Sequence, residues 1–184
     1  MTVPSIRSLL FVPGDGETKM LKALSSEADA VIIDLEDAVA PERKGYAREL
    51  TRDLLSHADR GGKPVFVRLN AFDTGMTAVD LAAVISGRPW GVVLPKCAGP
   101  DELERLSSYL EALEARDSIE SGSTRICSVA TETAAATLKL SCPDTSAAHR
   151  LWGLLWGGED LSATLGALSN RDATGGYTFP YQFA

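Results

Sequence analysis

Short runs of consecutive apolar residues recur along the chain, with longer and more polar stretches between them. Runs of four or five apolar residues without polar alternation are typical of parallel strands that are buried on both faces. The pattern therefore predicts six strands, within residues 9–12, 30–33, 65–67, 91–94, 126–130 and 154–156.

The stretches between these runs carry the spacing of amphipathic helices. The clearest places Leu103, Leu106, Leu110 and Leu113 on one helix face, and Pro100 suits the first turn of that helix. A second helix is predicted from Pro41, and weaker patterns cover residues 20–24 and 79–85. The last 19 residues, 166–184, show no period and are expected to form a loop.

Six strand–helix units in strict alternation predict a parallel α/β sheet, either open and doubly wound or closed into a barrel. A (β/α)₈ barrel needs eight strands and roughly 200 to 250 residues, whereas this chain has 184 residues and six predicted strands. Two units are therefore missing from a closed barrel. Since domains average about 150 residues, we expect a single domain over residues 1–184.

Composition narrows the class of partner. The chain has 18 Lys and Arg against 25 Asp and Glu, a formal net charge of −7, so a phosphate backbone would be repelled and we expect no nucleic-acid partner. No apolar run approaches the roughly 18 residues of a membrane helix, and the run after Ser8 is too short for a signal peptide. We therefore expect a cytoplasmic protein without a membrane partner.

The cysteines are odd in number and widely spaced, which predicts reduced structural thiols; they are Cys97, Cys127 and Cys142.

Charged residues follow the predicted strands, where parallel α/β folds bind their ligands. They are Asp15; Asp34, Glu36 and Asp37; Arg68; Lys96; Glu132; Glu159 and Asp160. Acids outnumber bases, an arrangement that favours a bound divalent cation. Glu132 and Asp160 follow consecutive strands, and two carboxylates are a typical protein share of a Mg²⁺ site. The alternative is that each acid caps the helix after it.

Two cations near these acids have alternative interpretations. Arg68 ends an apolar strand, where an unpaired guanidinium would be costly. It therefore binds either a substrate carboxylate or, in a structural ion pair, Glu36 or Asp37. Lys96 is a surface or loop-pairing residue or, on the other interpretation, a Schiff-base lysine. The glycine-rich turn 13–16 matches a dinucleotide fingerprint only weakly and predicts a tight turn.

Taken together, these strand-end motifs resemble the citrate lyase β-subunit-like proteins of the HpcH/HpaI aldolase superfamily. The matching stretches follow the family order over nearly the whole chain: RSLLFVPG (7–14), VIIDLEDAV (31–39), VRLN (67–70), VVLPK (92–96), ET (132–133) and WGGEDL (156–161). The resemblance implies a (β/α)₈ TIM barrel and Mg²⁺-dependent carbon–carbon lyase chemistry on coenzyme A or acyl-carrier thioesters, such as citryl- or malyl-CoA, with an oxo acid as the other reactant.

The resemblance also assigns roles to individual residues. Glu132 and Asp160 look like the metal ligands, and Arg68 looks like the clamp for a substrate carboxylate or enolate. The second-strand acids of the family correspond to Asp34, Glu36 and Asp37, which support the metal-bound waters and the arginine.

Two departures from the family pattern bear on activity. Alanines follow Glu132 and Thr133 where members usually carry a glycine, and relatives continue beyond Ala184 with two further βα units that hold an acid–base carboxylate. We therefore expect either a fragment of a longer protein or an oligomer whose partners cover the gap, and the resemblance favours a homo-oligomer such as a trimer. The alternatives to a lyase are a catalytically weak subunit or scaffold, and a coenzyme-A-independent aldolase for hydroxy-keto acids.

Overall fold

The computed structural model describes residues 5–139 and 146–183 of the 184-residue chain. Its centre is one six-stranded sheet in which every neighbouring pair of strands is parallel and the spatial order is the chain order. The strands are β1 (Leu9–Pro13), β2 (Ala30–Asp34), β3 (Val65–Arg68), β4 (Gly91–Leu94), β5 (Arg125–Val129) and β6 (Leu151–Leu155). This is a partial α/β barrel, which confirms the predicted fold class.

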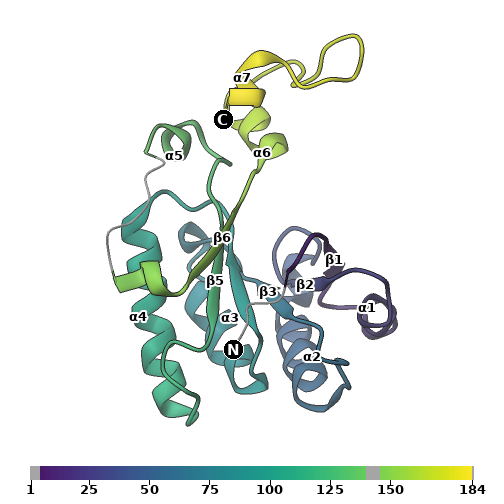
Figure 1. The fold of residues 1–184 in the computed structure, drawn as a ribbon, viewed down its shortest axis with the longest axis vertical. Helices are drawn as coiled ribbons and strands as arrows, with labels where there is room; N and C mark the ends of the chain where they lie inside the picture. Colours follow the sequence, from purple (N-terminus) through teal and green to yellow (C-terminus); the bar gives the residue numbers. More distant parts are fainter. Residues whose placement is uncertain (1–4, 140–145, 184) are drawn as a thin grey trace.

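Helices alternate with the strands. The α-helices are α1 (Glu17–Leu24), α2 (Lys44–His57), α3 (Thr77–Val84), α4 (Pro100–Arg116), α5 (Ala134–Leu138), α6 (Gly158–Thr164) and α7 (Phe179–Phe183), and short 3₁₀ helices cover 41–43, 72–74, 85–87 and 146–149. Helices α1 to α4 lie alongside the strands, whereas α5, α6 and α7 lie beyond the carboxyl ends of β5 and β6 (Figure 1). None of the helices in the described part of the chain is long and apolar enough to cross a membrane.

Alternation along the strands divides the core into two layers. Strand residues such as Val31 and Val92 pack with Leu54 and Leu106 from the helices. The other face of the sheet, the inside of the partial barrel, carries Ile32, Phe66, Val93 and Cys127. Because the helices bury one layer and the curvature of the sheet buries the other, the central strands are apolar on both faces, as the continuous apolar runs predict.

The two edge strands differ from the central ones. All five residues of β2 are buried, but Leu10 and Phe11 on β1 are 40% and 46% exposed, and Leu154 on β6 is 52% exposed. β1 and β6 each pair on one side only within the described residues, so the barrel is open between them. Unpaired apolar edges of this kind are normally covered by further strands or by a partner.

The end of the chain departs from the predicted pattern. The sixth strand runs over Leu151–Leu155, not 154–156, because Gly153 fits beside Cys127 in the ladder while Trp156 lies past the strand end. The expected loop over 166–184 is wrong in part, since Arg171 bridges Tyr177 in antiparallel fashion and α7 follows. Cys97 and Cys127 are buried free thiols, as predicted, and Cys142 lies outside the described residues.

Candidate active site at the carboxyl ends of the strands

A pair of charges links the ends of β2 and β3. Asp34 and Arg68 are the last residues of these strands and face each other in the parallel register. The Arg68 guanidinium donates from Nε to Asp34 Oδ1 at 2.8 Å and from Nη2 to Asp34 Oδ2 at 2.6 Å, and Nη1 lies 3.0 Å from Glu36 Oε2. Of the two alternatives for Arg68, the structure therefore contains the ion pair, with Asp34 as the main partner and not Asp37.

The same guanidinium keeps donors for a ligand. A guanidinium has five N–H bonds. Two of them form the hydrogen bonds to Asp34 and Nη1 also contacts Glu36, which leaves two. The side chain of Arg68 is 15% exposed, and its Cζ lies 5.1 Å from the centre of the Phe11 ring on β1. Arg68 is thus held in place by the chain while part of its side chain stays accessible to solvent.

Lys96, which follows β4, links the loop after β2 to the residue that follows β5. Its Nζ donates to Glu36 Oε1 at 2.8 Å and lies 3.7 Å from Asp37 Oδ1. The backbone of Lys96 is in the left-handed region with φ of 50°, and its amide donates to the Glu132 carboxylate. A non-glycine residue in this region is uncommon and costs energy. The side chain of Lys96 thus pairs with the loop after β2, while its backbone amide orients the Glu132 carboxylate.

The protonation equilibria reflect this crowding of charges. Burial alone would raise the pKa of Asp34, but its hydrogen bonds from Arg68 hold that pKa below the usual range. The pKa of Glu36 is raised because burial outweighs the attraction of Lys96 and Arg68. Burial acts to lower the pKa of Lys96, but the hydrogen bond to Glu36 and the charge of Glu36 outweigh burial, so the pKa of Lys96 is raised. The ammonium of Lys96 is therefore charged at neutral pH, which argues against a Schiff-base role.

Glu132 and Asp160 meet on the other side of the rim. Glu132 follows β5 and is 3% exposed, and Asp160 lies in the first turn of α6. Burial, together with the hydrogen bond and the charge of Asp160, raises the pKa of Glu132 to about 7. The capping alternative holds only in part, because Asp160 lies in a helix first turn but Gly157 is the N-cap, and Thr133 caps α5. Two carboxyl groups that repel each other, one of them buried, would be stabilised by a shared cation.

Two glycines let the backbone approach the site closely, Gly157 beside Glu132 and Gly14 beside Asp34. A Cβ on Gly157 would come within 2.2 Å of Glu132 Cγ, and a Cβ on Gly14 would come within 2.9 Å of the Asp34 carbonyl oxygen. Gly14 also donates its amide to that oxygen at 2.9 Å, so residues 13–16 form a tight turn as predicted. Sequence reasoning missed Gly157 as a site residue, although the Gly157–Gly158 pair beside an acid was the available signal.

The donor set can be compared with the needs of a metal ion. No group of three or more His, Cys, Asp or Glu side chains is arranged to enclose a metal within residues 5–139 and 146–183. The Glu132 and Asp160 pair does fit Mg²⁺, which binds one or two carboxylates and keeps waters or substrate oxygens in its other positions. These two residues would hold the ion.

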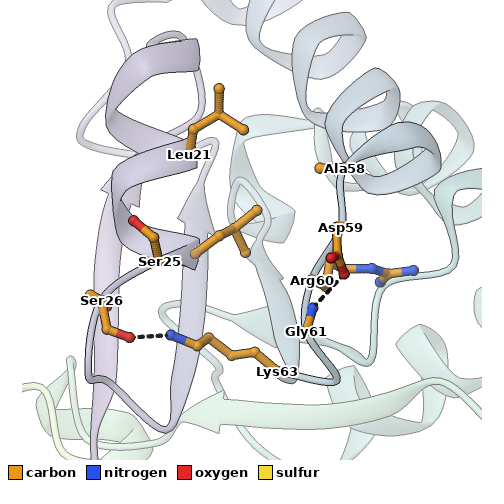
Figure 2. A pocket seen from close by; sticks show the side chains of 9 residues that line it. Leu21, Ser25, Ser26, Ala58, Asp59, Arg60, Gly61 and Lys63 are labelled. Atoms are coloured by element: carbon orange, nitrogen blue, oxygen red, sulfur yellow. Dashed lines mark hydrogen bonds between the residues drawn. The ribbon is translucent and has the colours of Figure 1, made fainter.

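A cavity lies at the opposite end of the barrel, before the strands begin. It has a cavity volume of about 500 Å³ and is lined by the end of α1 and by residues 58–63, which precede β3. Lys63 Nζ donates to the Ser26 carbonyl at 2.6 Å, and the Gly61 amide donates to Asp59 Oδ1 at 2.8 Å (Figure 2). The ammonium of Lys63 and the carboxylate of Asp59 are thus used in loop contacts.

Known proteins are similar to this chain in sequence. Citramalyl-CoA lyase, mitochondrial, of Mus musculus is 32% identical over 173 residues, covering 90% of this chain and 51% of that protein. A (3S)-malyl-CoA thioesterase of Cereibacter sphaeroides is 32% identical over 166 residues, covering 90% of this chain and 53% of that protein. The chain therefore spans about half the length of the curated relatives it matches.

A solved structure extends the comparison to three dimensions. The crystal structure of CitE from Mycobacterium tuberculosis in complex with magnesium, acetoacetate and coenzyme A superimposes with a TM-score of 0.71 and 31% sequence identity, covering 97% of this chain and 58% of that chain. The family match extends over residues 7–178. The chain belongs to the HpcH/HpaI aldolase/citrate lyase family, which confirms the resemblance inferred from its strand-end motifs.

Proposed function

We propose that this chain forms the metal- and oxoacid-binding rim of a Mg²⁺-dependent carbon–carbon lyase that cleaves a 3-hydroxy-carboxyacyl thioester such as citryl- or malyl-CoA. The observation that carries the proposal is the meeting of Glu132 and Asp160 beside the cluster of Arg68, Glu36 and Lys96. The citramalyl-CoA lyase relative and the magnesium, acetoacetate and coenzyme A of the CitE complex support it.

The chemistry divides between the residues of the rim. When bound, Mg²⁺ would supply Lewis-acid stabilisation of the substrate alkoxide and of the oxoacid carbonyl. Glu132 and Asp160 would hold the ion, and the Lys96 amide fixes the carboxylate of Glu132. The remaining N–H bonds of Arg68 would bind the thioester enolate or the substrate carboxylate, because a preorganised guanidinium stabilises developing negative charge.

The reaction is balanced without a redox partner. In malyl-CoA the bond between C2 and C3 of the acyl chain breaks, the hydroxyl loses its proton to become the aldehyde of glyoxylate, and the departing enolate carbon gains a proton to give acetyl-CoA. None of Asp34, Glu36 or Asp37 is assigned as the proton carrier, since Asp34 and Glu36 are committed to Arg68 and Lys96 and Asp37 lies beside Lys96.

Product analysis with each thioester tests the proposal. The chain is incubated with Mg²⁺ and malyl-, citramalyl- or citryl-CoA; acetyl-CoA and the oxo acid are quantified, and free thiol is followed with a thiol reagent. Carbon–carbon cleavage releases equal amounts of acetyl-CoA and oxo acid without free thiol, and Asp160→Asn abolishes it. Free CoA with malate and no oxo acid would instead identify hydrolysis, the activity in the name of the thioesterase relative.

A second candidate, a subunit that needs partner chains, is favoured by the open edges at β1 and β6. Such a subunit would bind Mg²⁺ and oxaloacetate yet leave all three thioesters intact. Its Asp160→Asn variant would assemble normally, which size-exclusion chromatography with light scattering measures.

A further inference from the structure

A buried lysine lies directly behind the acidic loop of the rim. Lys44 is the first residue of α2 and is 9% exposed. Its Nζ lies 2.7 Å from each of three acceptors, the carbonyl oxygens of Leu35 and Glu36 and the Oδ1 atom of Asn70. An ammonium group has three N–H bonds, so every donor of Lys44 is used within the protein and none faces the rim.

The two carbonyls belong to the peptide units that carry the rim acids. On the other side of this loop, Asp34 accepts the amides of Glu36 at 2.8 Å and Ala38 at 3.0 Å. The backbone at Glu36 is therefore held from both sides, by a carboxylate on its amide and by an ammonium on its carbonyl. The Glu36 side chain extends from this fixed point to Arg68 and Lys96.

Lys44 is itself held by a second layer of contacts. Asn70 donates from Nδ2 to the Leu35 carbonyl at 3.0 Å and to Asp80 Oδ2 at 2.8 Å, and fully buried Asp80 pairs with Arg48 at 2.6 Å. A buried ammonium is costly unless its donors are satisfied, and burial lowers the pKa of Lys44. An apolar side chain would fill this space without that cost. It would not bind the two carbonyls after β2.

We propose that Lys44 is a positioning residue for the rim: it fixes the Leu35–Glu36 backbone so that the Glu36 carboxylate holds Arg68 and Lys96 in their ligand-binding orientation. The effect on ligand binding rests on the proposed function. The effect on the loop does not, because it follows from the contacts of Lys44 alone.

Amide hydrogen exchange tests the loop directly in the protein without ligand. In Lys44→Met, the amides of Glu36 and Ala38 exchange about tenfold or more faster relative to the Val31 amide of β2, since hydrogen bonds to a charged group have been removed from this loop. Val31 donates to the Pro64 carbonyl and reports on the sheet itself. The matched control is Arg52→Met, which removes a 44% exposed cation from the same helix without touching the loop. Equal acceleration at all three amides, or none, would overturn the proposal.

Calorimetric titration with Mg²⁺ and oxaloacetate tests the consequence for the rim. We expect about tenfold weaker ternary binding in Lys44→Met and unchanged binding in Arg52→Met, and equal binding in both variants would overturn the positioning role. If the unsubstituted chain does not bind the probe, the proposed function fails while the exchange result still decides the role of Lys44 in the loop. Should Lys44→Met not fold, Lys44→Arg keeps the charge but not the three-fold donor geometry, and the same selective acceleration is expected there.

Discussion

Two clusters of buried charge lie at opposite ends of the same barrel. At the amino ends of the strands, Arg150 donates to both carboxylate oxygens of Glu114 at 2.8 and 2.7 Å, and neither side chain is more than 2% exposed. At the carboxyl end, Arg68 and Lys96 are 15% and 33% exposed. They face the acids Asp34, Glu36, Asp37, Glu132 and Asp160.

The two clusters differ in charge balance and in access to solvent. Glu114 also accepts the amides of Gly122 and Thr124, so the amino-end pair is matched in charge and closed to solvent. The carboxyl-end cluster has more acids than bases and an open side, and one of its carboxyl groups has its pKa raised to about 7. An ion pair by itself therefore does not identify a site. A ligand site is instead indicated by surplus charge that the protein holds in place where solvent can reach it.

Breaking the closed pair should have the largest effect. Arg150→Met leaves the Glu114 carboxylate buried without its cation, so we expect the free energy of unfolding to fall by about 3–5 kcal/mol. Urea denaturation measures the loss. The double variant Glu114→Leu and Arg150→Met removes both charges but leaves the amides of Gly122 and Thr124 without their acceptor, so it should recover only part of the loss. A double variant no more stable than Arg150→Met would contradict the unpaired carboxylate as the cause of the loss.

Breaking the open cluster should cost less stability but remove binding. Arg68→Met leaves Asp34 and Glu36 near the solvent-accessible rim, where water and Lys96 partly compensate. We expect a loss of about 2 kcal/mol in unfolding free energy and loss of oxaloacetate binding. A variant that binds oxaloacetate with unchanged affinity would exclude Arg68 as the clamp.

Acid should weaken the closed pair of Glu114 and Arg150. Burial would raise the pKa of Glu114, but Arg150 and the two amides hold it down at about 2, below the ordinary value of 4.5. Because the folded pKa is lowered, this stabilisation is complete above about pH 4.5 and is lost as the pH falls towards 2. Unfolding free energies between pH 6 and pH 2.5 should decline more steeply for the unsubstituted chain than for Glu114→Gln. Parallel curves would contradict the assignment.

The smallest expected effect has the opposite direction. Glu132→Gln removes one of two carboxyl groups that repel each other, so at pH 8 and without Mg²⁺ we expect a gain of about 1 kcal/mol in unfolding free energy. Asp160→Asn should act in the same direction, whereas Glu114→Gln destabilises. Thermal unfolding of the three variants in chelator-treated buffer measures the contrast, and a destabilised Glu132→Gln protein would place Glu132 with the structural acids.

Local patterns in the sequence were sufficient for the central strands and for the rim as a set of residues. Continuous apolar runs located β2 to β5, and reading the residues after each run found Arg68, Lys96 and Glu132. Strand β6 was misplaced because its edge position leaves Leu154 exposed and Gly153 weakens the apolar pattern. The bridge between Arg171 and Tyr177 depends on side-chain contacts that have no local period.

Pairings within the site were harder to predict than its members. The bond from Arg68 to Asp34 follows from register, because both residues end neighbouring parallel strands, and a count of strand lengths could have found it. The contact of Gly157 with Glu132 and the donation from the Lys96 amide depend on how the loops close after β4, β5 and β6. No spacing in the sequence encodes those distances.

If the surplus acid at the carboxyl ends of the strands forms a ligand site, binding should depend on its carboxylate pair. Calorimetric titration of Mg²⁺ together with oxaloacetate into the unsubstituted chain, Glu132→Gln and Glu114→Gln tests it most directly. We expect ternary binding by the unsubstituted chain and by folded Glu114→Gln, and none by Glu132→Gln. Equal binding by all three proteins would contradict it, because the ligand would then be held without the carboxylate pair.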